Sequence, residues 1–351
     1  MEQYRIDVSK GIEFGLYSIG DHILNPHNGS KISAEKRIQE LIEAAKLADE
    51  AGLDVFAVGE SHQAHFTTQA HTVILGAIAQ ATKNIKIASS ATVLSTSDPV
   101  RVYEDFATID LISNGRAEIV AGRGSRIGGY SLLGYDVNYY EELFEEKMDL
   151  LLKINKEESV TWKGQFRTPL EHATIIPRAK NNNMPIWRAV GGPPASAIKA
   201  GHAGVPMMLT TLGGPAINFK VSVDAYREAA QQSGFDPATL PIATTSLFYT
   251  AENSQDALSE YYPHIHAGML ALRGGGYPKQ QFTNAVDYRD ALMIGSPQQI
   301  IEKMLYQHEL FGQQRFMAQI DFGGVPFDKI EKNIELIATE IMPAVRKHIA
   351  K

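Results

Sequence analysis

The sequence predicts a single α/β domain, a (β/α)8 TIM barrel formed by residues 1–351. Patterns of buried strands and of amphipathic helices alternate eight times, which indicates parallel strands joined by crossover helices. A length of 351 residues suits one barrel with insertions. Polar or glycine-rich segments follow several of the strands, as expected where barrel loops carry a site. An open, doubly wound sheet is the alternative, but eight units of this length favour closure.

The predicted elements are defined by apolar periodicity and by capping residues. Asp98 before Pro99 and Ser296 before Pro297 each place an N-cap directly before a proline at the first helical position. Ser33 caps the first helix, and Asn114-Gly115 ends the third. The predicted strands cover residues 11–18, 53–58, 85–94, 117–121, 185–190, 205–209, 242–250 and 316–322. The predicted helices cover residues 34–51, 71–81, 99–113, 139–154, 194–201, 219–233, 297–311 and 328–349, with a β excursion at 160–177 and a helical insertion over the barrel mouth at 253–281.

Composition narrows the class of protein. The formal net charge of −7 argues against nucleic acid as a main partner. The absence of cysteine excludes disulfides, thiolate catalysis and thiolate metal sites. No apolar run reaches membrane-spanning length and the first residues contain no signal core, so we expect a cytoplasmic enzyme without a membrane partner. His62, His65 and His71 lack the spacing of a metal motif, and no metal site is expected.

Two glycine-rich turns are candidate anion sites. Gly122-Arg123-Gly124-Ser125-Arg126 follows a predicted strand and combines open backbone amides with two guanidinium groups. Gly191-Gly192-Pro193-Pro194-Ala195-Ser196 opens a helix, whose free amides and positive dipole end favour an anion. Pro193 and Pro194 have no N–H, which reduces the donors available there. The structural alternatives are an ion-paired arginine in a surface turn and a rigid strand-to-helix turn.

The sequence resembles the bacterial luciferase-like family of flavin-dependent monooxygenases and oxidoreductases. The resemblance rests on a VLS…DPVR…GR…AGRGS pattern over residues 93–125 and extends from Phe14-Gly15 to residues 307–312. It implies a barrel that binds FMN non-covalently at the carboxyl ends of its strands. By the same resemblance, Gly122, Arg123, Gly124, Gly191, Gly192 and Ser196 bind the phosphate. The flavin ring lies against Ser90 and Ala91, whose peptide bond the resemblance implies to be cis.

The segment Glu60-Ser61-His62-Gln63-Ala64-His65-Phe66 supplies the candidate catalytic residues. Relatives typically have Glu-His-His-x-x-x-Phe, so Ser61 stands where the family has its first histidine. Serine cannot replace imidazole as a base near neutral pH. We therefore expect His62 to be the general acid/base, with His65 as a second candidate; local hydrogen bonding in the loop is the structural alternative. Gln319 and Asp321, at the end of the last strand, are candidate polar contacts to substrate.

The resemblance implies an FMN-dependent oxidoreductase, a monooxygenase that uses reduced flavin and O2 on a small organic substrate. The sequence contains no second nucleotide-binding domain, so we expect a separate flavin reductase to supply reduced FMN. Hydride transfer by a flavin or a deazaflavin without oxygen insertion is one alternative. A non-catalytic flavin-binding protein is another, since Ser61 replaces the family's histidine. By analogy with the family we expect a homodimer.

Overall fold

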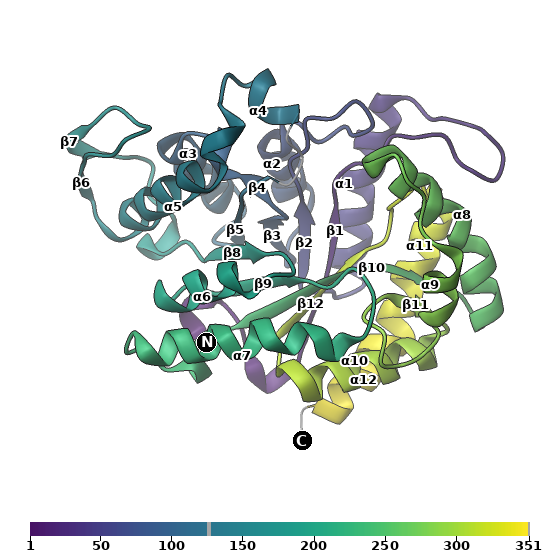
Figure 1. The fold of residues 1–351 in the computed structure, drawn as a ribbon. Coiled ribbons are helices and arrows are strands. Elements are labelled where there is room, and N and C mark those ends of the chain that lie inside the picture. The colour runs from purple at the N-terminus through teal and green to yellow at the C-terminus, as the bar shows by residue number, and fades with distance from the viewer. Residues whose placement is uncertain (125–127, 350–351) are drawn as a thin grey trace.

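The computed structural model describes residues 1–124 and 128–349, and its core is a closed barrel of parallel strands (Figure 1). Strand β12 pairs with β1, and β10 pairs with both β12 and β9, which completes the ring. The predicted (β/α)8 barrel is therefore confirmed, and the open sheet is excluded. The barrel strands are β1 (Glu13–Ser18), β2 (Val55–Val58), β3 (Lys86–Ser89) with β4 (Thr92–Val93), β5 (Ala117–Gly122), β8 (Ile186–Val190), β9 (Met207–Thr210), β10 (Ile242–Thr250) and β12 (Arg315–Gln319).

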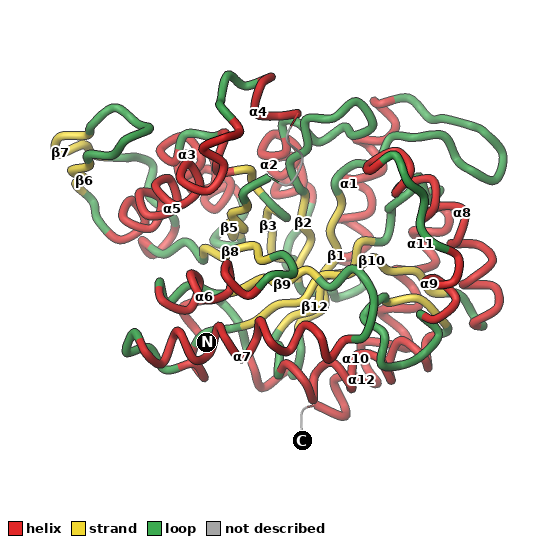
Figure 2. The backbone as a smooth tube through the Cα atoms, viewed as in Figure 1, coloured by secondary structure: helices red, strands yellow, loops and turns green. Residues whose placement is uncertain are grey.

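Helices surround the barrel on its outside (Figure 2). They are α1 (Ala34–Glu50), α2 (His71–Ala81), α3 (Pro99–Ile112), α5 (Tyr140–Lys156), α6 (Pro194–His202), α7 (Lys220–Gln232), α10 (Pro297–Phe311), α11 (Phe327–Leu336) and α12 (Met342–Ile349). The predicted caps are present. Ser33 accepts from the Lys36 N–H, and Asp98 accepts from the N–H groups of the first turn of α3. Among the described residues, no helix is both long enough and apolar enough to cross a membrane.

The remaining elements are insertions between barrel units. Strands β6 (Ser159–Trp162) and β7 (Leu170–Thr174) form the antiparallel excursion expected at residues 160–177. Helix α4 (Gly128–Leu132) follows β5. Helices α8 (Ser254–Arg273) and α9 (Lys279–Asn284) occupy the segment expected as a helical insertion. A short strand, β11 (Met293–Gly295), then pairs with β10 before α10 begins.

Two predicted elements are interrupted in the structure. The strand expected at residues 85–94 is two strands, β3 and β4, separated by a cis peptide bond between Ser90 and Ala91. The close approach of β2 marks this point, because a Cβ atom at Gly59 would lie 2.2 Å from the Ser90 carbonyl oxygen. The helix expected at residues 328–349 contains a π-helical turn at Ile337–Ile341. Apolar periodicity continues across both interruptions, so it gives no sign of either.

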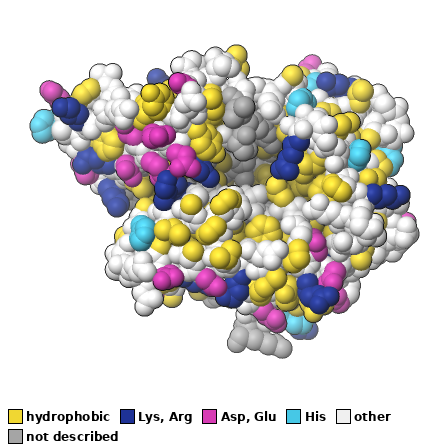
Figure 3. Space-filling model, in the orientation of Figure 1, with side chains coloured by type: hydrophobic (Ala, Val, Ile, Leu, Met, Phe, Trp, Pro, Cys, Tyr) yellow, Lys and Arg dark blue, Asp and Glu magenta, His cyan; other side chains and the backbone are white. Residues whose placement is uncertain are grey.

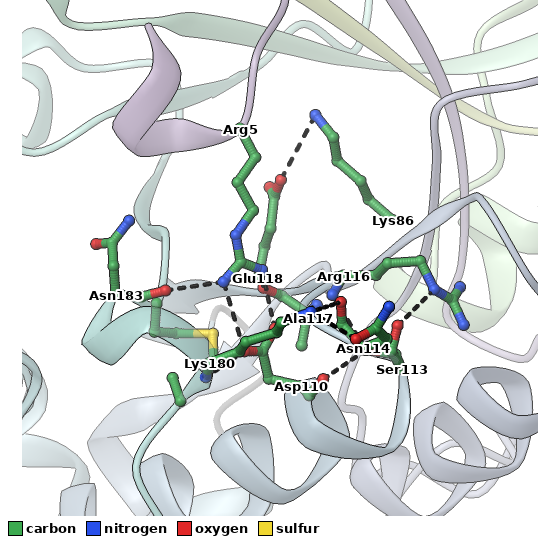
Figure 4. A network of polar contacts seen from close by, with 12 residues as sticks. Arg5, Lys86, Asp110, Ser113, Asn114, Arg116, Ala117, Glu118, Lys180 and Asn183 are labelled. Carbon is green, nitrogen blue, oxygen red and sulfur yellow. Dashed lines mark hydrogen bonds and ion pairs between the residues drawn. The ribbon is translucent and has the colours of Figure 1, made fainter.

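Buried charged residues close the amino-terminal end of the barrel. Arg315 donates two hydrogen bonds to Glu118, at 2.6 and 3.1 Å, and one to Glu13 at 2.8 Å. Figure 4 shows Lys86 beside Glu118 and Arg5 beside Asp110. The Nη1 atom of Arg5 lies 2.9 Å from the Asp110 carboxylate. Opposite charges in direct contact offset the cost of burial. Since this end is closed by structural ion pairs, the opposite end remains for a site.

Candidate active site

A cavity of about 510 Å³ lies at the carboxyl ends of the barrel strands. Every strand position contributes to its wall, and the lining includes apolar side chains such as Val190, Met208, Leu247 and Phe322. In Figure 3, hydrophobic and basic side chains lie on both sides of the upper centre of the face in view. Both the volume and the mostly apolar wall are typical of a site for a small molecule or cofactor.

The cavity brings together most of the residues predicted from sequence. The predicted residues that line it are His62, Ser90, Ala91, Gly122, Arg123, Gly124 and Gly191. Gly192 lines a second, adjoining cavity of about 360 Å³. His65 and Ser196 line neither cavity; the His65 ring packs against Phe66 with 5.2 Å between centroids. Arg126, the second predicted guanidinium, and Ser125 lie outside the described residues.

His62 forms a hydrogen-bonded pair with Glu60 in the cavity wall. Its Nε2 lies 2.6 Å from Oε1 of Glu60, and the other carboxylate oxygen accepts a 2.7 Å hydrogen bond from the Val93 N–H. Burial raises the pKa of Glu60 above its usual value. In the tautomer in which a neutral His62 donates its Nε2–H to an ionised Glu60, the lone pair of the ring lies on Nδ1. Glu60 was not predicted as the partner of His62, although its position just after a barrel strand is a signal for a role in the site.

A second histidine lies behind this pair. His71, at the start of α2, is buried, and its Nε2 lies 2.8 Å from the Thr92 hydroxyl. Burial, with a smaller effect from the charge of His62, lowers the pKa of His71 to about 3. His71 is therefore neutral at physiological pH and supports the cavity wall rather than carrying charge.

Arg123 belongs to a network of alternating charges. Its guanidinium lies 3.2 Å from Glu141 and 5.3 Å from the centre of the Tyr140 ring. Lys199 links Glu141 to Glu145, at 3.7 and 3.0 Å. A third basic residue, Arg188 on β8, also binds Glu145, so three basic side chains share two carboxylates. Asp149 is a third carboxylate that interacts with Arg188 and Glu145, so the charges of the network balance, and Arg123 is its basic member that lines the cavity.

Arg188 explains the position of Ser196. Its Nε donates to the Ser196 hydroxyl at 3.1 Å, while its two terminal nitrogens bind Glu145 at 2.9 and 2.6 Å. Arg188 was not among the predicted site residues, because a single arginine inside an apolar strand forms no motif. The hydroxyl thus lies close to the charge network but outside the cavity wall.

Gln319 and Asp321, the two polar candidates at the end of the last strand, lie in different surroundings. Gln319 lines the cavity, and its Nε2 is buried without a hydrogen-bond partner among the described residues. Asp321 binds Arg37 and the Ser18 hydroxyl instead, and it does not line the cavity. The expectation that both side chains face the cavity was therefore wrong for Asp321, because β12 ends at Gln319 and the chain beyond it brings the Asp321 carboxylate to Arg37 of α1.

Residues 20–314 match the luciferase-like monooxygenase family. The chain belongs to that family. The expectation of a luciferase-like, flavin-dependent oxidoreductase is thereby confirmed. The chain is similar to the oxygenase component of flavin-dependent trigonelline monooxygenase from Acinetobacter baylyi. The two are 23% identical over 87% of this chain and 89% of the relative. F420-dependent glucose-6-phosphate dehydrogenase from Amycolatopsis mediterranei is 29% identical over 58% of this chain and 63% of the relative.

Solved structures of the luciferase-like family share the fold. Monooxygenase RslO1 from Streptomyces bottropensis superimposes with a TM-score of 0.84 and 24% identity, over 95% of this chain and 99% of that one. The oxygenating constituent of 3,6-diketocamphane monooxygenase from Pseudomonas putida, in complex with FMN, has a TM-score of 0.75 and 18% identity, over 95% and 98% of the two chains.

Proposed function

We propose that the protein is the oxygenating component of a two-component flavin monooxygenase, which binds reduced FMN and uses O2 to oxygenate a small organic substrate. One observation carries this proposal: three kinds of group line the same cavity. They are the backbone and small side chains at Ser90–Ala91 and Gly122, the guanidinium of Arg123, and the hydrogen-bonded pair of His62 and Glu60. A relative named as an oxygenase component, and a structural neighbour described as an oxygenating constituent, support a separate source of reduced flavin.

The residues present fit FMN. Arg123, with the amides near Gly124 and Gly191, would hold the phosphate, because a guanidinium binds phosphate oxygens in pairs. The small side chains of Ala91 and Gly122 leave room for a flat ring. The chemistry that FMN supplies when bound is the two-electron reduction of O2, one atom of which enters the substrate while the other leaves as water.

The chain itself positions and shields the reactants. Apolar side chains, among them Met208, Leu247 and Phe322, exclude water from the cavity. His62 holds or moves a proton at Nδ1, while Glu60 fixes the ring through Nε2. Gln319 offers an amide donor to whichever group occupies the cavity.

Anaerobic titration of the purified protein with reduced FMN, oxidised FMN and F420 tests the proposal. Reduced FMN should bind most tightly, and a substrate screen under 18O2 should then give a product carrying one labelled oxygen atom. If F420 binds most tightly, the cavity belongs to a hydride-transfer enzyme. F420 is included because one relative is named as an F420-dependent dehydrogenase. If none of the three binds, the proposed function is refuted. Sedimentation of the same sample tests the expected homodimer.

A further inference from the structure

The second cavity, about 360 Å³ in volume, adjoins the main cavity between the loop after β9 and the segment that joins α8 to α9. The two cavities share the lining residues Gly191, Thr210, Leu212, Met269 and Arg273. A molecule that enters the second cavity can therefore extend into the main one. Phe219, Leu212 and Met269 make part of its wall apolar.

Arg273 brings a positive charge to the point where the two cavities meet. It is the last residue of α8, and Gly274 ends that helix in the left-handed conformation. Within residues 1–124 and 128–349, no carboxylate forms an ion pair with Arg273, and no acidic residue of this part of the chain lines the second cavity. The guanidinium is thus available to a ligand.

Tyr277 adds a buried hydroxyl without a partner. Its side chain is 6% exposed, and its Oη has no hydrogen-bond partner among the described residues. Burial, with a smaller effect from the Asp290 carboxylate, raises the pKa of Tyr277 to about 12, so the group remains a donor at neutral pH. An unsatisfied buried hydroxyl is unfavourable, and a ligand that accepts its hydrogen bond would remove that penalty.

Gly213 lies close to the Tyr277 hydroxyl and to the side-chain amide of Gln281. A Cβ atom at Gly213 would lie 2.7 Å from Oη of Tyr277 and 3.6 Å from Nε2 of Gln281. The φ of Gly213, +143°, also disfavours any residue with a side chain. Tyr277, Gln281 and Arg273 therefore present a phenol, an amide and a guanidinium to one cavity.

We propose that the second cavity is an anion subsite, in which Arg273 and Tyr277 bind the carboxylate of an organic acid substrate. The inference rests on the proposed function, because it places the oxidisable part of that acid in the main cavity. The apolar wall at Phe219 and Met269 suits an aromatic or branched body between the two ends.

The position of Arg273 separates this anion from the FMN phosphate. Arg123 follows β5, whereas Arg273 ends the helix that follows β10, and β8 and β9 lie between these strands in the barrel. Arg123 also belongs to its own ion-pair network, in which Glu141 lies between Arg123 and Lys199. Two cationic groups on different sides of one cavity suit two anions, one on the cofactor and one on the substrate.

The test compares carboxylates with their neutral amides on the FMN-loaded protein. Benzoate with benzamide, and phenylacetate with phenylacetamide, are titrated by calorimetry and by ligand-observed NMR. At least one acid should bind tenfold or more tightly than its amide. Arg273→Gln should abolish that preference, and Tyr277→Phe should weaken acid binding three- to tenfold. Lys279→Gln removes a nearby exposed charge that does not line the cavity, and it should change nothing.

Three results would overturn the proposal. The first is equal binding of acids and amides by the unaltered protein. The second is a preference for the acid over its amide that persists in Arg273→Gln. The third is a loss of FMN affinity in Arg273→Gln as large as that in Arg123→Gln. The last result would assign Arg273 to the cofactor phosphate. Acid binding that depends on Arg273 in a protein that binds no flavin would refute the proposed function and leave the subsite standing.

Discussion

The ion pair between Arg123 and Glu141 allows two substitutions with opposite expected effects on FMN affinity. Arg123→Gln removes the guanidinium proposed to bind the phosphate. Glu141→Gln removes a carboxylate that lies 3.2 Å from that guanidinium and competes with the phosphate for it. If Arg123 binds the phosphate, the first substitution weakens binding and the second strengthens it.

The exposure of the pair sets the magnitude of these effects. A hydrogen bond to a charged group contributes about 1.5–3 kcal/mol. The side chains of Arg123 and Glu141 are 23% and 58% exposed, so their own pairing is worth only about 0–1 kcal/mol and partly offsets the gain from phosphate. Arg123→Gln should therefore cost roughly 1.5–2 kcal/mol, about a 10- to 30-fold rise in Kd. Glu141→Gln should lower Kd by up to about fivefold.

The assay is titration of each variant with FMN, followed by flavin fluorescence, at low and at high salt. Arg101→Gln is the matched control, because Arg101 also pairs with a carboxylate, at 3.2 Å to Glu104, but lies on α3 away from the cavity. A change of less than twofold in Arg123→Gln would refute the assignment of the phosphate. Weaker binding in Glu141→Gln would show that the ion pair shapes the loop rather than competing with the ligand.

Three further predictions concern the site and the stability of the barrel. His62→Gln should lower kcat by roughly 100-fold or more with the substrate that the screen identifies, while FMN affinity stays within threefold; equal losses of both would mean that His62 only builds the wall. Burial lowers the pKa of His71 to about 3, so in the folded protein this side chain stays neutral between pH 6.5 and 4.5. In the unfolded chain it binds a proton below about pH 6.5. His71 should therefore lower the free energy of unfolding by about 1.4 kcal/mol for each unit that the pH falls in this range. This contribution to the pH dependence of the free energy of unfolding, measured with urea between pH 6.5 and 4.5, should disappear in His71→Gln. Glu118→Gln should cost roughly 3–5 kcal/mol in urea unfolding, because Arg315 then keeps a buried charge with only one carboxylate, and a cost below 1 kcal/mol would show that the ion pair is dispensable.

The sequence alone predicted the architecture, because helix caps and apolar periodicity are local properties of the chain. Helix α3 begins at Pro99 behind the Asp98 cap, and α10 runs from Pro297 to Phe311 behind Ser296, as their residues require. The order of strands and helices then favoured the barrel, since parallel strands need crossover helices. The placement of Arg123 and His62 at strand ends followed from the same order.

Only the tertiary structure decided how the site residues are used. His62 and His65 are indistinguishable by residue type, yet packing places His62 in the cavity beside Glu60 and directs His65 against Phe66. Ser196 lies in a turn suited to phosphate, but Arg188 from β8 binds its hydroxyl.

The groups that line the second cavity were likewise not predictable from local sequence. Nothing local relates Gly213 to Tyr277, which lie 64 residues apart in the numbering and meet because α8 and the loop after β9 fold over the same end of the barrel. Local sequence thus determined which elements form and in what order. Contacts between residues distant in sequence determined which polar groups remain available to a ligand, because hydrogen-bond partners and burial are set by packing rather than by neighbours along the chain.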